Sequence, residues 1–289
     1  GMGIMGSRMA GHLLAAGYPL IVHNRTRAKA DDLIAQGATW AETPAAMAAQ
    51  ADIIFTMIAH PEAVSTAALG ADGFLDHMRA GALWIQSSTV NPSFVHKMAA
   101  EAQARSIRFL DAPVAGSKTQ ADNADLVFII GGSEADVEAT RPLLEVMSGR
   151  VAHVGAVGMG TSMKVILNML LATTMAAFAE GVALGEALGF DKATLLNVLV
   201  GSAVAPPYVA GKRQKLESGD YPADFPLRWM QKDLHMVTLA AYEAGVALPV
   251  ANTAKEIYQL GIRAGLGEDD FSAIYRLIAA NQDAVDQQD

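Results

Sequence analysis

The chain contains no cysteine, and this absence removes several kinds of chemistry at once. Without thiols there are no disulfides, no thiolate metal sites and no cysteine nucleophiles. A chain free of disulfides is typical of the cytoplasm, so we expect a cytoplasmic protein. The seven histidines are scattered, and no two have the i, i+4 spacing of a helical zinc site. We therefore expect no metal centre.

Positive charge is also scarce, because 21 lysines and arginines face 30 acidic residues and leave a formal net charge of -9. Nucleic-acid binding needs a basic surface, so we expect no nucleic-acid partner. No uninterrupted apolar run reaches the roughly 18 residues of a membrane span. The longest candidate, residues 165–188, is interrupted by asparagine, glutamate and glycine, so we expect no membrane partner.

The first half of the chain alternates short apolar runs with helical stretches. The runs that we predict as strands are residues 19–23, 52–58, 82–86, 107–111, 126–130 and 150–154. The predicted helices between them include residues 7–16, 27–36, 92–105 and 134–147. The strand runs are apolar throughout, as expected of a parallel sheet with helices on both faces. This pattern predicts a doubly wound, Rossmann-type α/β domain.

The pattern changes after residue 158, where strand-like runs stop. Helices are predicted at residues 161–188, 192–199, 227–244, 249–264 and 270–279, each bounded by glycine or proline. We therefore predict a Rossmann-type α/β domain over residues 1–157 and an all-helical domain over residues 158–289. The long helix would join the two as a hinge, and the helical domain would serve substrate binding or oligomerisation.

The first six residues, Gly1-Met2-Gly3-Ile4-Met5-Gly6, match the glycine-rich loop of a dinucleotide fold. Gly1 would make the tight turn, Gly3 would admit the pyrophosphate, and Gly6 would let helix and strand pack closely. The following helix would point its positive end at the phosphates. Residues 1–5 are thus candidate cofactor contacts. The motif should follow a buried strand, so we expect apolar residues before Gly1 in the natural protein.

The second predicted strand ends at Asn24-Arg25-Thr26, where NAD-preferring folds carry an acid for the ribose hydroxyls. Arg25 can pair with a 2′-phosphate, and Thr26 can donate to it. NADP(H) is the preferred cofactor on this evidence, with NAD as the alternative. A turn whose arginine is simply solvated is the other interpretation.

Lys164 and Asn168 are four residues apart, so they share one face of the long predicted helix. A lysine among apolar neighbours is partly desolvated, which lowers its pKa toward the range useful for proton transfer. The alternative is a structural lysine whose ammonium reaches water between the domains. The spacing does not choose between the two.

Four ordered motifs together resemble the β-hydroxyacid dehydrogenases, which include 3-hydroxyisobutyrate dehydrogenase and glyoxylate/succinic semialdehyde reductase. The motifs are the glycine loop, residues 111–117 (DAPVAGS), Gly160-x-x-x-Lys164-x-x-x-Asn168, and Lys232-Asp233. The resemblance runs the whole chain in order. It implies that Lys164 is the general acid/base and that Asn168 hydrogen-bonds the substrate.

The resemblance implies roles at further positions. Thr89 would contact the nicotinamide side of the cofactor, and Met57-Ile58 would lie along its adenosine side. Lys232 would close over the cofactor, with Asp233 beside it at the substrate. Phe225 would border the substrate.

The sequence departs from the family at Ala115, where a serine usually helps to hold the substrate carboxylate. The amides of Gly116 and Ser117, with the Ser117 hydroxyl, would remain for that task. Resemblance to the semialdehyde reductase branch favours NADPH-dependent reduction of a small aldehyde acid, such as glyoxylate or succinic semialdehyde. The nicotinamide would supply hydride and Lys164 a proton.

Two other functions stay open. One is NAD(P)-dependent oxidation of 3-hydroxyisobutyrate or a similar β-hydroxy acid, and the other is a non-catalytic, dinucleotide-binding interaction module. The family resemblance also implies a homodimer or homotetramer. Finally, Lys212-Arg213-Gln214-Lys215 is predicted to be a solvated helix face, with a basic patch near the cofactor phosphates as the alternative.

Overall fold

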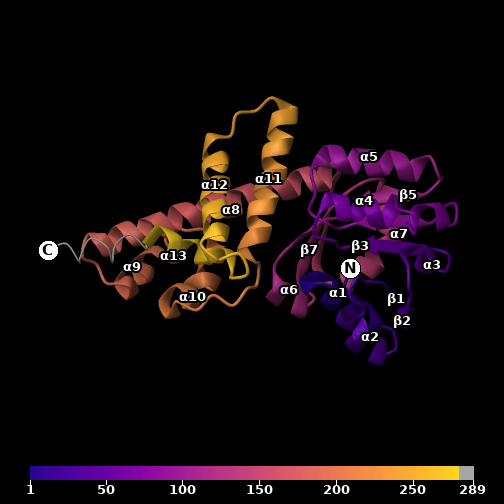
Figure 1. The fold of residues 1–289 in the computed structure, drawn as a ribbon, viewed down its shortest axis with the longest axis horizontal. Coiled ribbons are helices and arrows are strands. Elements are labelled where there is room, and N and C mark those ends of the chain that lie inside the picture. The colour runs from indigo at the N-terminus through magenta and orange to yellow at the C-terminus, as the bar shows by residue number, and fades with distance from the viewer. Residues whose placement is uncertain (280–289) are drawn as a thin grey trace. The chain divides into compact units, whose positions relative to one another are not determined.

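The computed structural model describes residues 1–279, and the chain forms two compact units (Figure 1). The first unit is Gly1–Val165 and the second is Ile166–Asp289. The division falls inside the long helix α8 (Met159–Ala187), a few residues beyond the boundary predicted at residue 157. Each unit has its own core.

The first unit is built on a six-stranded sheet in the order β3-β4-β5-β7-β6, with β8 also paired to β7. Strands β3 (Ile53–Thr56), β4 (Leu83–Gln86) and β5 (Arg108–Asp111) are parallel and in register. Their last residues, Thr56, Gln86 and Asp111, therefore lie side by side at one edge. Strands β1 (Ile21–Val22) and β2 (Thr39–Trp40) form a separate parallel pair.

The remaining strands differ from the all-parallel prediction. Strand β7 (Leu126–Gly131) runs antiparallel to β5 and to β6 (Val114–Ala115), and parallel to β8 (Ser148–Gly155). A parallel neighbour needs a crossover of about a dozen residues or more. The connection between β6 and β7 holds only the short helix α6 (Lys118–Asp122), so the chain reverses there. The Rossmann-type α/β prediction is otherwise confirmed.

Helices cover both faces of this sheet, which explains why its strands are apolar throughout. Along β4, Trp84 enters one core cluster and Leu83 and Ile85 enter another. The Trp84 ring stands edge-on to Phe74 and Phe109, with ring centroids 4.9 and 5.0 Å away. The helices and 3₁₀ turns of the first unit are α1 (Ile4–Ala15), η1 (Arg27–Ala30), α2 (Asp31–Ala35), α3 (Pro44–Ala48), α4 (Pro61–Leu69), η2 (Leu75–His77), α5 (Pro92–Gln103), α6 and α7 (Glu134–Glu145), and η1 and α2 pack beside β1 in a core of their own.

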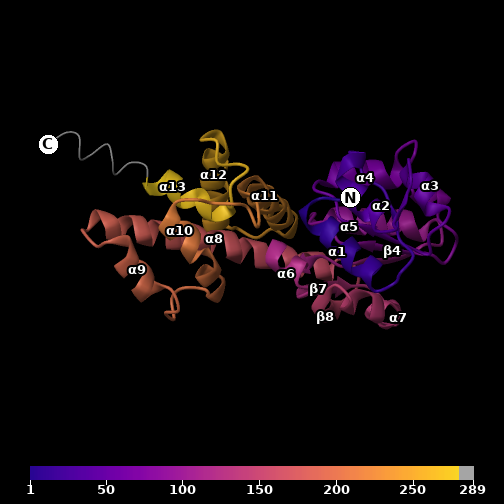
Figure 2. The same ribbon diagram turned by 90° about the horizontal axis from the view of Figure 1, so that it is seen from below.

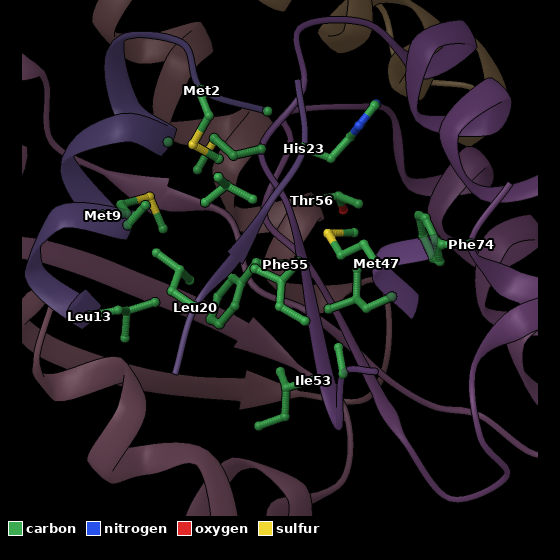
Figure 3. Close-up of a pocket in the computed structure, with 18 of the residues that line it drawn as sticks. Met2, Met9, Leu13, Leu20, His23, Met47, Ile53, Phe55, Thr56 and Phe74 are labelled. Carbon is green, nitrogen blue, oxygen red and sulfur yellow. The ribbon is translucent and has the colours of Figure 1, made fainter. Parts of the chain in front are cut away.

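A cavity of about 390 Å³ lies among α1, β1 and β3. Its lining is mostly apolar: Met9 and Leu13 of α1 face Leu20 and Phe55 across it (Figure 3). The cavity borders the glycine loop. The apolar strand expected before Gly1 concerns residues outside this chain, and that expectation stays a prediction.

The second unit is helical throughout its described residues, as predicted. It contains the rest of α8 with α9 (Lys192–Leu199), η3 (Pro207–Lys212), α10 (Arg213–Ser218), α11 (Leu227–Ala244), α12 (Pro249–Arg263), η4 (Phe271–Ala273) and α13 (Ile274–Ala279). Helices α11 and α12 lie side by side (Figures 1 and 2), and Gly245 ends α11 with a φ of 68°. The core of this unit includes Tyr258 of α12, Leu234 of α11 and Met175 of α8.

Helix α8 contains most of the longest apolar candidate in the sequence, residues 165–188. By length and composition alone, Met159–Ala187 is long and apolar enough to cross a bilayer. The central helix of a soluble helical domain passes the same test. One side of α8 packs Ala172, Met175, Ala179 and Val182 into the core of the second unit. Ile166, Leu170 and Leu184 of the same helix are exposed.

Lys212 corrects a second prediction, because it does not lie on a solvated face. Its side chain is only 9% exposed, and Nζ lies 2.9 Å from the Asp270 carboxylate, which is fully buried. Asp224 lies 3.4 Å from the same ammonium. The Phe271 ring centroid is 4.9 Å away, which adds a cation–π contact. Lys212 is therefore an internal charge of the helical unit.

Candidate active site

The glycine loop leads directly into α1, with Gly3 as the residue that caps the helix. A side chain at Gly1 would place its Cβ 2.6 Å from the Met57 carbonyl oxygen, and one at Gly6 would collide with the Gly1 carbonyl. At Gly3 nothing lies within 4 Å of that position. The loop is therefore packed tightly at two glycines and open at the middle one.

The first turn of α1 has the features of an anion site. No side chain caps it, and Ile4 and Met5 are its first two residues. The backbone N–H groups at a helix start need acceptors, and a phosphate supplies them. The open space at Gly3 lets a pyrophosphate approach this backbone. The residues present thus fit a dinucleotide.

Asn24 organises the turn after β1. Its Oδ1 accepts a hydrogen bond of 2.9 Å from the Met2 N–H, and its Nδ2 donates to the Thr26 carbonyl at 2.8 Å. The side chain is thus engaged within the protein, where it ties the turn to the glycine loop. Arg25 and Thr26 are exposed beside it. Of the three predicted ribose contacts, these two present their side chains at the surface.

The loops after β3 and β4 are joined by Ser88, a residue that the sequence analysis did not single out. Its Oγ accepts a 2.8 Å hydrogen bond from the Ile58 N–H, and its own N–H donates to Gln86 Oε1 at 2.6 Å. Met57 and Thr89 are the adjacent residues in these loops, and both are half-buried. The predicted nicotinamide-side and adenosine-side contacts thus lie in two loops held together at one sheet edge. The signal available in the sequence was the pair Ser87-Ser88 directly after the predicted strand at residues 82–86.

Gly116 and Ser117 form the turn between β6 and α6. Gly116 has a φ of 117°, which favours glycine, and Ser117 starts α6. Both the N–H and the hydroxyl of Ser117 donate to Gln120 Oε1 at 2.9 Å. The two Ser117 donors expected to hold a substrate carboxylate are therefore engaged with Gln120 in this structure. Ala115, half-buried in β6, adds no donor.

The amino end of α8 is held by Asp111, the last residue of β5. Asp111 Oδ1 accepts from the Gly158 N–H and Oδ2 from the Thr161 N–H, both at 2.7 Å. The carboxyl is fully buried, and burial raises its pKa to about 6 although these hydrogen bonds favour the charged form. A side chain at Gly160 would place its Cβ 2.7 Å from the Asp111 carbonyl oxygen. The first turn of α8 therefore touches the β5 backbone.

Lys164 lies one turn further along the buried side of α8. It is 9% exposed, and Thr161, Val165 and Asn168 are buried on the same side. Met163, between them in sequence, is 40% exposed on the other side. The spacing of Lys164 and Asn168 thus places both side chains on one face, as predicted, and Lys164 is largely removed from water.

Asn168 belongs to a buried polar group within the helical unit. Its Nδ2 donates to Asp233 Oδ2 at 2.5 Å, and Lys232 Nζ lies 2.6 Å from Asp233 Oδ1. Asn168 is 2% exposed and Asp233 is 3% exposed. The structure thus brings together three of the predicted site residues from α8 and α11. An amide, a carboxylate and an ammonium in series can orient a polar substrate.

Phe225 lies in the segment before α11 and is half-buried. Its ring centroid is 5.9 Å from that of Phe271, and its carbonyl accepts from the Phe271 N–H at 2.9 Å. Asp270 Oδ2 accepts from the Asp224 and Phe225 N–H groups at 3.1 and 3.3 Å. The buried Lys212–Asp270 pair therefore anchors the backbone that carries Phe225. No local pattern in the sequence indicates this anchor, because Lys212 and Asp270 are 58 residues apart.

Both units match models of known families. Residues 1–155 match the NAD binding domain of 6-phosphogluconate dehydrogenase. Residues 158–278 match the model described as NAD-binding of NADP-dependent 3-hydroxyisobutyrate dehydrogenase. Together the two models account for nearly the whole chain.

Whole-chain comparisons agree with these models. The chain is 34% identical over 280 residues to glyoxylate/succinic semialdehyde reductase 2, chloroplastic, of Arabidopsis thaliana, covering 97% of this chain and 78% of the relative. The solved 3-hydroxyisobutyrate dehydrogenase of Mycobacterium tuberculosis with L-serine is 30% identical, with a TM-score of 0.88 over 96% of this chain and 97% of that one. A structure of Psf3 in complex with NADP+ and 2-OPP is 26% identical, with a TM-score of 0.87 over 96% and 98%.

Proposed function

The chain belongs to the β-hydroxyacid dehydrogenase family of NAD(P)-dependent oxidoreductases, and from this premise we propose that it reduces a small aldehyde acid to the hydroxy acid with NADPH. Glyoxylate and succinic semialdehyde are the proposed substrates. The observation that carries the proposal is the buried Lys164, which shares one face of α8 with Asn168. The resemblance to a glyoxylate/succinic semialdehyde reductase supports the substrate class.

Reduction of an aldehyde needs a proton at the carbonyl oxygen as hydride reaches the carbon. When bound, the reduced nicotinamide supplies the hydride. Lys164 holds the proton and donates it to the oxygen as negative charge develops there. Asn168 can hydrogen-bond the substrate beside Lys164, because the Asn168–Asp233 hydrogen bond fixes the orientation of its amide.

The direct test measures steady-state rates in both directions with NADPH, NADH and their oxidised forms. We expect NADPH consumption with glyoxylate and succinic semialdehyde, at a kcat/KM above that for oxidation of 3-hydroxyisobutyrate or L-serine. Efficient oxidation of a β-hydroxy acid without aldehyde reduction would favour the dehydrogenase alternative. Cofactor binding with no turnover of any substrate would favour the non-catalytic module.

NADPH preference is proposed to depend on Arg25, which is exposed beside Asn24. Arg25→Ala is expected to raise the KM for NADPH about 10- to 100-fold, because a hydrogen bond to a charged group contributes about 1.5–3 kcal/mol. The KM for NADH should change little, since NADH has no 2′-phosphate. Initial rates with each cofactor check this.

Arg27→Ala is the matched control, because Arg27 is an exposed neighbour whose guanidinium lies over Trp40 and near Glu42. It should leave the ratio of the two KM values close to that of the unmodified protein. Equal losses with NADPH and NADH in Arg25→Ala would contradict a contact with the 2′-phosphate.

A further inference from the structure

One carboxylate, that of Asp111, accepts hydrogen bonds from N–H groups at the amino end of α8. The first turn of a helix leaves N–H groups without partners in the helix, and they must find acceptors elsewhere. Asp111 accepts from two of the N–H groups at this end, those of Gly158 and Thr161, each through a different oxygen at 2.7 Å. The Met159 N–H donates to the Ala156 carbonyl. Asp111 is therefore the side chain that accepts from both Gly158 and Thr161 at this turn.

The Asp111 carboxylate is fully buried, and no ion pair to it appears within residues 1–279. The two N–H groups and the positive end of the helix dipole stabilise the negative charge of this carboxylate. A buried acid held in this way is costly unless both of its oxygens stay bonded. Each carboxylate oxygen thus holds one N–H group of the turn in a fixed place.

Close backbone packing on the same side adds to this restraint. A side chain at Gly160 would place its Cβ 2.5 Å from the Ile129 carbonyl oxygen and 2.7 Å from that of Asp111. Gly131 lies opposite Asp111 in the sheet, and a side chain there would place its Cβ 2.9 Å from the Gly160 nitrogen. The helix therefore cannot slide toward the sheet, and the Asp111 hydrogen bonds keep it from rotating about its axis.

This restraint reaches Lys164 through the helix itself. Thr161 and Lys164 are three residues apart and lie on the same side of α8, where both are buried. A rotation or shift of the first turn moves the Lys164 ammonium with it. Misplacement of a reacting group by about 1 Å can lower a rate about 100-fold.

We propose that Asp111 is a positioning residue for Lys164: its carboxylate clamps Gly158 and Thr161 and so fixes where the Lys164 ammonium is held. The inference rests on the proposed function, because it takes Lys164 to be the proton donor. Asp111 itself touches neither substrate nor cofactor in this proposal.

The test is a double-mutant cycle between Asp111→Asn and Lys164→Ala in the full chain. Asparagine keeps the shape but presents an N–H₂ to one of the two N–H donors, so one hydrogen bond of the clamp is replaced by repulsion. We expect Asp111→Asn to lower kcat about 10- to 100-fold with Lys164 present, with the KM for NADPH changed less than about twofold. In the Lys164→Ala background the same substitution should have no further effect on the residual rate.

Asp191→Asn is the matched control, since Asp191 caps α9 by accepting from the Thr194 N–H and α9 carries no proposed site residue. It should leave kcat unchanged in both backgrounds. An equal loss from Asp111→Asn in both backgrounds, or no loss at all, would overturn the positioning role. Should Asp111→Asn not fold, judged by circular dichroism and NADPH binding, Asp111→Ser is measured in the same cycle. Its shorter hydroxyl cannot bond both N–H groups.

The cycle separates this inference from the proposed function. If Lys164→Ala alone leaves the rate unchanged, the catalytic assignment of Lys164 fails, and the positioning role fails with it. If Lys164→Ala lowers the rate and Asp111→Asn does not, only the positioning role is wrong.

Discussion

Lys164→Ala is expected to lower kcat for aldehyde-acid reduction by about 10²- to 10⁴-fold, which is the usual contribution of a positioned general acid. The reason is that the developing negative charge on the carbonyl oxygen would lose its proton donor. Lys164 is 9% exposed, so bulk water has little access to replace it. NADPH binding should be nearly unchanged, because the glycine loop and the Asn24 turn lie elsewhere on the first unit. Stopped-flow or steady-state absorbance at saturating NADPH measures the rate.

Met163→Ala is the control for this substitution. Met163 is the preceding residue of α8, 40% exposed, and alanine is a good helix former, so the helix should persist and the rate should stay within about twofold. Native-like turnover by Lys164→Ala would refute the role of Lys164 as the proton donor.

Lys212→Met is expected to destabilise the helical unit by about 3–5 kcal/mol, the cost of leaving a buried charge without its partner. Asp270 is fully buried, and its carboxylate also accepts from the Asp224, Phe225 and Ser272 backbone. Methionine fills the volume of the lysine stem but leaves Asp270 without its cation. Urea unfolding followed by circular dichroism should show a lower midpoint for this variant.

Two further variants make this prediction specific. Arg213→Met removes the neighbouring charge, which pairs with Glu217 on the surface, and should change stability by no more than about 1 kcal/mol. Lys212→Met combined with Asp270→Asn removes both charges and should recover part of the loss. A midpoint for Lys212→Met equal to that of Arg213→Met would show that the buried pair contributes little.

Much of the fold was predictable because each element carries a local signal. The apolar runs of β3 to β5 and the glycine and proline boundaries of α9 and α11 gave nearly the observed ranges. Strand direction was not predictable in this way, since an apolar run reads alike in either direction, and β7 is antiparallel to two neighbours. Helices α3 and α4 were not among the predicted ranges because they are short, although each begins with proline at a favoured position.

The candidate site was predictable where residues are close in sequence. The i, i+4 spacing placed Lys164 and Asn168 on one face, but it could not show that Asn168 donates to Asp233, 65 residues later. Likewise, Lys212 looked like part of a charged surface because its partner, Asp270, follows 58 residues later. Asp111 stood in a recognised motif, yet only the structure shows its contact with α8. The expected homodimer or homotetramer stays a prediction.

The glycines of α8 have a practical consequence for protein engineering. Exchanging a helical glycine for alanine is a standard way to raise thermal stability, by about 0.4–1 kcal/mol where the backbone allows it. Gly181, exposed near the carboxyl end of α8, has nothing within 4 Å of its missing Cβ and is open to that change. Gly160 is closed to it, because the sheet backbone occupies that place. The same helix thus accepts alanine at Gly181 but needs glycine at the turn that leads to Lys164.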